Sequence, residues 1–162
     1  MRFMDHRGRG LWGLASALVL AGTVAGSAVA ASPAAVTIVS NVTFNPDGPN
    51  YGDFTATGAA VDSGVLCPSG TFVDLGIRFA GFQSNRGEVQ LQVVKLFTCD
   101  DGSGEFVVKM QIQANFDTGI ETFSWVVLDG NGEYASLRGS GLGSTVPTQT
   151  GNINTFVGFV LG

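Results

Sequence analysis

The sequence predicts a single all-β domain, and three observations support this prediction. Residues 106–116 alternate between apolar and polar side chains with a period of two, which is typical of a half-buried strand. Clusters of glycine, asparagine and aspartate interrupt the chain at short intervals, as turns do between strands. No segment of residues 31–162 combines a 3.6-residue apolar period with helix caps. Short strands at this spacing indicate a β-sandwich or an up-and-down barrel.

The first thirty residues have the pattern of a secretory signal peptide. Three arginines within residues 1–10 precede the apolar run 11–25, and the small residues 28–30 form a cleavage motif. The apolar run is too short to span a membrane as a helix, and the mature chain has no stretch that could do so. We therefore expect a secreted, extracellular protein whose mature domain is residues 31–162.

Eight strands are predicted in the mature domain. They occupy residues 35–44, 51–61, 71–82, 88–98, 106–116, 119–128, 133–144 and 152–161. Glycine-rich and Asx-rich turns separate many of them, at residues 45–49, 84–87, 100–104 and 129–132. In the third strand Val73, Leu75, Ile77 and Phe79 share one face, which predicts that this face packs into the core. Asp74 and Arg78 would then form an exposed pair; if their face looks inward instead, they form a buried charged pair and a candidate site.

Two strands, residues 119–128 and 152–161, carry apolar side chains on both faces. A strand with one face in water does not have this composition, so either another part of the chain or another subunit covers the outer face. We expect a homo-oligomer built on these strands.

The two cysteines, Cys67 and Cys99, are predicted to form a disulfide, as an even number of cysteines does in an exported chain. A hairpin centred on residues 84–85 would pair residues whose numbers sum to about 169. The two cysteine numbers sum to 166, so the predicted hairpin brings them together at its open end. The strand pairing and the disulfide therefore support each other.

Composition excludes several classes of function. The only histidine, His6, lies in the predicted leader, so histidine-dependent catalysis and histidine-ligated zinc are excluded in the mature chain. Residues 31–162 hold five basic and twelve acidic side chains, a formal charge of −7, and the basic ones are scattered. A nucleic-acid partner needs clustered positive charge and is not expected. The acidic turn at residues 100–105 lacks the spacing of an EF-hand and is read as a solvated turn, so no metal site is predicted.

One segment has an ordered glycine–aromatic–arginine pattern. Gly130 and Gly132 precede Tyr134, and Arg138-Gly139 follows four residues later. This segment resembles the G-x-G-x-[FY]-x-x-x-R-G stretch of the allene oxide cyclase and dirigent proteins. The resemblance implies a closed eight-stranded antiparallel barrel, commonly trimeric, with an apolar pocket inside and no cofactor. It also implies that Arg138 lines that pocket, although an arginine paired with a carboxylate across the barrel is the competing interpretation.

From these features we expect a secreted antiparallel up-and-down barrel of about eight strands that binds a small apolar or aromatic molecule in its interior. If it catalyses a reaction, the resemblance implies a cofactor-free cyclase, isomerase or stereochemical guide. The candidate ligand-binding residues are Arg138, Tyr134, Trp125, Phe123, Met110 and Phe106. The alternative is a non-catalytic structural or interaction module at the cell surface, for which the barrel interior would be filled by side chains.

Overall fold

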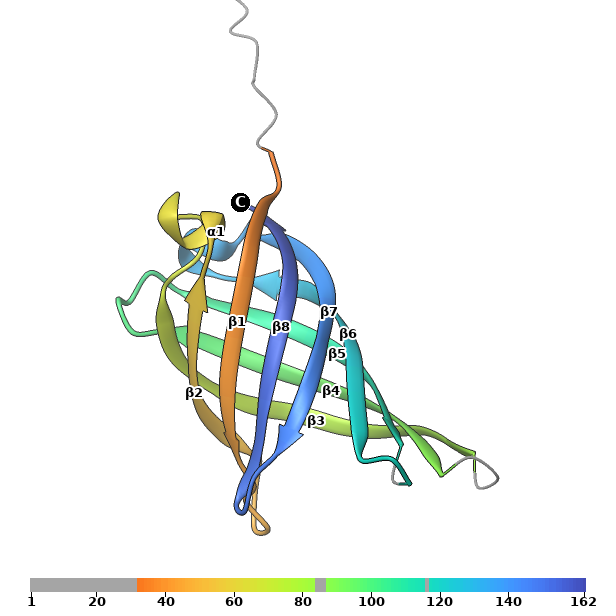
Figure 1. Cartoon of the computed structure of the whole chain (residues 1–162). Coiled ribbons are helices and arrows are strands. Elements are labelled where there is room, and N and C mark those ends of the chain that lie inside the picture. Colours follow the sequence, from red (N-terminus) through yellow and green to blue (C-terminus); the bar gives the residue numbers. More distant parts are fainter. Residues whose placement is uncertain (1–31, 84–86, 116) are drawn as a thin grey trace, which may run out of the picture.

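The computed structural model of the chain describes residues 32–83, 87–115 and 117–162. Eight antiparallel strands form a closed barrel in sequence order, and β8 pairs with β1 to complete it (Figure 1). The strands are β1 (Ala34–Thr43), β2 (Tyr51–Thr57), β3 (Ser69–Gln83), β4 (Glu88–Cys99), β5 (Glu105–Asn115), β6 (Ile120–Gly130), β7 (Arg138–Pro147) and β8 (Gly151–Leu161). The predicted all-β antiparallel barrel is confirmed. The predicted signal peptide, residues 1–30, and the predicted hairpin centre at residues 84–85 lie outside the described residues.

The two ends of the barrel differ. One end, called the helix end below, carries α1 (Ala59–Asp62), the 3₁₀ helix η1 (Gly132–Tyr134) and the β4–β5 turn. The other, the hairpin end, carries the β1–β2 and β7–β8 turns and the last residues of β3 and β5. In Figure 1 the helix end is at the top. Within the described part of the chain, no helix has the length and apolar content needed to cross a membrane.

Two strands are shorter than the sequence predicts. β2 ends at Thr57 rather than at residue 61, because Gly58 adopts a positive φ of 106° and turns the chain into α1. β7 begins at Arg138 rather than at residue 133. Here Gly132, with φ 59°, opens η1, and the backbone N–H of Leu137 then closes a turn on the carbonyl oxygen of Tyr134 at 3.0 Å.

Aromatic rings fill the interior from the helix end to the middle of the barrel. Phe97 stacks on Phe106 with ring centroids 5.0 Å apart. Phe156 contacts the rings of Phe97, Phe123 and Trp125 edge-to-face, a geometry that the ring quadrupoles favour. None of these rings is more than 3% exposed. Side chains therefore pack this half of the barrel.

Glycines on β7 and β8 make room for two of these rings. A Cβ atom on Gly143 would collide with the ring of Phe123, and one on Gly158 would collide with the ring of Trp125. The alternating glycines of residues 139–143 thus let a bulky ring or a neighbouring backbone approach closely.

Two irregularities in β3 change which of its residues face the interior. The register with β4 shifts between Asp74 and Gly76 and again between Phe79 and Gly81. A bulge adds one residue to one strand, so the inward and outward positions exchange beyond it. Asp74 faces inward before the first shift, and Ile77 takes an inward position opposite Val93 after it.

The predicted exposed pair of Asp74 and Arg78 is therefore wrong. Asp74 is only 6% exposed and lies inside the barrel. Arg78 lies on the outer face, opposite Gln92 and beside an outer depression next to Val94. The bulge between them places the two side chains on opposite faces of the sheet.

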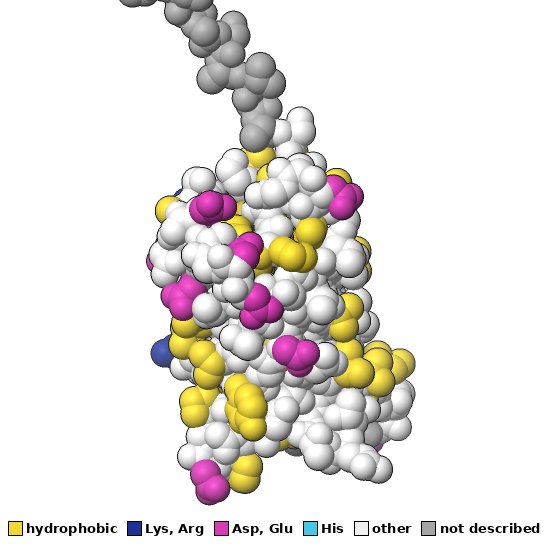
Figure 2. Space-filling view, turned by 90° about the vertical axis from the view of Figure 1, so that its left-hand side faces the viewer, with side chains coloured by type: hydrophobic (Ala, Val, Ile, Leu, Met, Phe, Trp, Pro, Cys, Tyr) yellow, Lys and Arg dark blue, Asp and Glu magenta, His cyan; other side chains and the backbone are white. Residues whose placement is uncertain are grey.

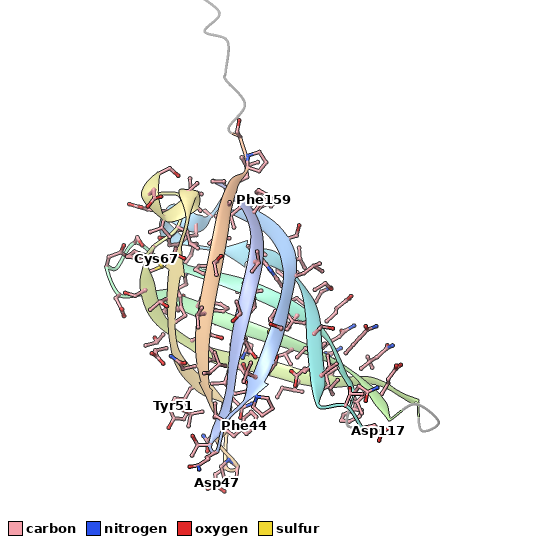
Figure 3. All side chains as sticks on the ribbon, viewed as in Figure 1. Phe44, Asp47, Tyr51, Cys67, Asp117 and Phe159 are labelled. Atoms are coloured by element: carbon pink, nitrogen blue, oxygen red, sulfur yellow. A yellow bond between two sulfur atoms is a disulfide. The ribbon has the colours of Figure 1, made fainter. Side chains whose placement is uncertain are left out.

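The predicted disulfide between Cys67 and Cys99 is confirmed. It joins the loop after α1 to the end of β4 at the helix end, where Figure 3 labels Cys67. Gly70 pairs with Cys99 in the β3–β4 register, which brings the end of β4 beside the chain that leaves Cys67. Two buried sulfur atoms thus tie α1 to the barrel wall.

Candidate functional site

Arg138 lies on the outer face of the barrel. Gly139, its neighbour on β7, takes the inward position against Val160, so the alternation of the strand directs Arg138 outward. Its guanidinium donates a hydrogen bond to the carbonyl oxygen of Leu137 at 2.7 Å, and Arg138 lines an outer depression that includes Phe159. The expectation that Arg138 faces an interior pocket is therefore wrong.

Tyr134 closes the helix end instead of lining a ligand pocket. It is 3% exposed, its ring packs edge-to-face on Phe106 at 5.7 Å, and its hydroxyl forms a 2.8 Å hydrogen bond with Ser103. The hydroxyl is satisfied within the protein, as is usual for a buried tyrosine.

The four predicted wall residues Phe106, Met110, Phe123 and Trp125 all face the interior and are buried. Three of them belong to the packed ring cluster of the helix-end half. Met110 lines the interior cavity described next, and Phe123 lines a separate depression of about 360 Å³ that also includes Leu142. Whether any of them contacts a ligand stays a prediction.

That cavity has a volume of about 170 Å³ and lies at the hairpin end of the interior, because Phe44 and Asn50 of the β1–β2 turn are among its lining residues. Its apolar lining residues are Val42, Phe44, Ile77, Leu91, Val93, Met110 and Ile112, and its polar ones are Asn50, Asp74, Lys95, Glu121, Asn152 and Asn154. Phe44 and Ile77 are 55% and 53% exposed, so they form an apolar rim open to solvent. Figure 3 labels Phe44 at the base of the barrel, beside the β1–β2 and β7–β8 turns.

A buried ion pair forms part of the cavity wall. The ammonium Nζ of Lys95 donates to Oδ1 of Asp74 at 2.6 Å and lies 4.4 Å from the ring centroid of Phe72. Oδ2 of Asp74 accepts a hydrogen bond from the Asn50 side chain at 3.0 Å. Burial lowers the pKa of Lys95, while the charge and hydrogen bond of Asp74 oppose that shift. Both carboxylate oxygens of Asp74 are thus engaged within the protein.

Other polar groups lie on the β1–β7–β8 side of the interior. The Thr145 hydroxyl donates to Oδ1 of Asn154 at 3.0 Å. Within residues 32–83, 87–115 and 117–162, the buried Ser40 hydroxyl and Oδ1 of Asn152 have no hydrogen-bond partner. An unsatisfied buried polar atom is costly, so such atoms point to a missing partner such as a ligand or water. No hydrogen bond or ion pair joins Glu121 to another group in the part of the chain that the structure describes.

Sequence reasoning missed Lys95, Glu121, Asn152 and Asn154, although a signal was present for most of them. Lys95 lies two residues from both Val93 and Phe97, so it faces the same side of its strand as these buried side chains, and Asn154 likewise faces the same side as Phe156. A polar residue on a strand face that is otherwise apolar is a candidate for a buried functional group.

No family model, curated protein or solved structure matches the chain. The resemblance of residues 130–141 to the allene oxide cyclase and dirigent proteins therefore stays a prediction. In the structure this segment forms the β6–β7 connection and the start of β7.

Proposed function

We propose that the protein is a secreted barrel that binds a small molecule with a largely apolar body in the cavity at its hairpin end. The observation that carries the proposal is the cavity itself, in which buried polar groups lie beneath the apolar rim of Phe44 and Ile77. The cavity is smaller than the roughly 300–1,000 Å³ of pockets for drug-sized ligands. A ligand of about six non-hydrogen atoms, or the end of a longer one resting on the rim, suits this volume.

The proposal concerns binding and makes no claim of turnover. Lys95 and Asp74 neutralise each other, and Asn50 holds the second oxygen of Asp74, so this pair shapes the wall. Export is supported by the leader-like pattern of residues 1–30 and by the disulfide. The family resemblance supports a ligand inside the barrel, but Arg138, the residue that it implies for the pocket, does not line this cavity.

Met110 offers a direct test, because it is the only methionine in residues 31–162 and lines the cavity. We expect 1-pentanol, titrated into the protein purified from an exporting host, to shift the methyl NMR signal of Met110 in a saturable manner. Ile112→Phe adds volume to the cavity wall and should weaken this binding at least about tenfold, since the cavity then no longer accommodates the chain of the alcohol.

The matched control is Leu142→Phe, which adds a ring on the outer face, where Leu142 is 70% exposed. The affinity of this variant for 1-pentanol should be within about twofold of that of the unsubstituted protein, because an exposed substitution does not alter the interior. Absence of any saturable shift of the Met110 signal in the unsubstituted protein contradicts the proposal.

A second candidate function, assembly into a homo-oligomer, is favoured by the outer face of β7, β8 and β1. Leu142 and Val157 are paired neighbours there, 70% and 55% exposed, and Phe159 is 58% exposed. β1 and β8 contain no charged residue and β7 contains only Arg138, although the chain carries a net charge of −5. Two acidic copies can therefore approach on this face without direct charge repulsion.

We expect light scattering at micromolar protein to give a mass above that of one chain, and Val157→Glu to shift it to the monomer. A glutamate at this position buries an unpaired charge in the contact. Thr55→Glu, an exposed outer position on β2, is the control and should leave the mass unchanged. A monomeric unsubstituted protein rules out this second candidate.

A further inference from the structure

The charges inside the hairpin-end cavity do not balance. Its lining includes two carboxylates, Asp74 and Glu121, and one ammonium, that of Lys95. Lys95 is bonded to Asp74, so Glu121 is left without a protein cation among the described residues. A half-buried carboxylate in a concave site attracts positive charge more strongly than one on the open surface.

The other positively charged side chains that the structure describes do not face the cavity, so they cannot neutralise the Glu121 carboxylate there. Arg78 and Arg138 lie on the outer face, beside outer depressions. Lys109 pairs with Val94 and Val126 at an outward position, between the inward residues Val108 and Met110. In the part of the chain that the structure describes, Lys95 is thus the only cation facing the cavity.

A second observation, independent of Glu121, points to a hydrogen-bond donor in the ligand. Asn152 lines the same cavity, and its Oδ1 is buried without a donor among the residues that the structure describes. On the neighbouring inward position of β8, Asn154 already accepts from Thr145. An amide oxygen that is removed from water calls for an N–H or O–H group, and a ligand carboxylate has none to give.

The outside of the protein favours cations too. Acidic side chains are spread over the face shown in Figure 2, where few basic ones are visible. With a net charge of −5 the chain repels anionic ligands at long range and attracts cationic ones.

We propose that the ligand of this cavity is a primary amine, held as its ammonium form by the Glu121 carboxylate and the Asn152 amide oxygen, with its apolar body against the aliphatic wall. This inference rests on the proposed binding function and names the class of ligand. An ammonium offers three donors and one positive charge, which match the carboxylate and the unsatisfied oxygen.

The test compares ligands with similar apolar bodies at pH 7 and fixed ionic strength, using the Met110 methyl signal. Pentylamine should bind about tenfold more tightly than 1-pentanol, because a charge-assisted hydrogen bond is stronger than one between neutral groups. Pentanoate should bind more weakly than the alcohol.

Glu121→Gln keeps the side-chain shape and removes the charge. It should lower the affinity for pentylamine about tenfold and leave that for 1-pentanol within about twofold, which also shows that the variant cavity is intact. Glu133→Gln makes the same change of net charge at an exposed site on η1, at the opposite end, and should change neither affinity.

The outcomes separate the two proposals. If pentanoate binds as tightly as pentylamine, or if Glu121→Gln leaves pentylamine binding unchanged, the amine inference is overturned while 1-pentanol binding still supports a ligand cavity. If no compound of the series binds, the proposed function fails and the inference fails with it.

Discussion

Lys95→Met is expected to lower the free energy of unfolding by about 3–5 kcal/mol, because it leaves the Asp74 carboxylate inside the barrel without its cation. The two side chains are only 3% and 4% exposed, so water cannot replace the lost partner. Asn50 alone would then donate to Asp74. Urea unfolding followed by the fluorescence of Trp125, the only tryptophan of residues 31–162, measures this loss.

The double variant Lys95→Met/Asp74→Leu should recover most of that stability. Removing both charges ends the desolvation cost, and replacing a buried pair with apolar side chains is often neutral or stabilising. Lys109→Met, at a half-buried outward position on the adjacent strand, is the control and should change stability by less than about 1 kcal/mol. If Lys95→Met lowers the free energy of unfolding no more than the control Lys109→Met does, the assignment of a buried ion pair is contradicted.

The fold could be predicted from the sequence because most strands show the elementary period of two. β5 alternates without a break from Phe106 to Ala114, and the inward residues are those that the alternation indicates. Closure into a barrel, rather than a sandwich, followed from the resemblance of residues 130–141 and not from the alternation itself.

The side on which Asp74 lies could not be predicted from a regular alternation, because the bulges of β3 interrupt it. Gly76 and Gly81 immediately follow the two register shifts, and an isolated glycine inside a strand is a sign of a bulge. If Gly76 is taken to mark a bulge, the alternation places Phe72 and Asp74 inward before the bulge and Ile77 inward after it.

The expected position of Arg138 was wrong for a different reason. Arg138 and Tyr134 were assigned by resemblance, which carries no information on which face of β7 the arginine occupies. The glycines at 139, 141 and 143 are the feature that decides it, since the inward positions beside Trp125 and Phe123 admit no side chain. The cavity residues come from six strands and one loop, and only the register brings them together.

Reduction of the Cys67–Cys99 disulfide is expected to lower the free energy of unfolding by about 3–4 kcal/mol. The bond spans 32 residues, and a closed loop of this length restricts the unfolded chain by about that amount. A loss of this size lowers the melting temperature by about 10 °C for a domain of this length. Circular dichroism melts with and without a reductant measure it.

Because the bond lies at the helix end, its loss should act locally before it acts globally. Leu66 and Ala60 are buried next to Cys67 and hold α1 on the barrel, while the proposed ligand cavity lies at the opposite end. Below the melting temperature, the reduced protein should therefore bind pentylamine as the oxidised protein does.

Cys67→Ala/Cys99→Ala should reproduce the melting temperature of the reduced form, apart from the packing of two small side chains. An unchanged melting temperature on complete reduction contradicts a stabilising bridge, and loss of ligand binding in the folded, reduced protein contradicts the separation of the two ends.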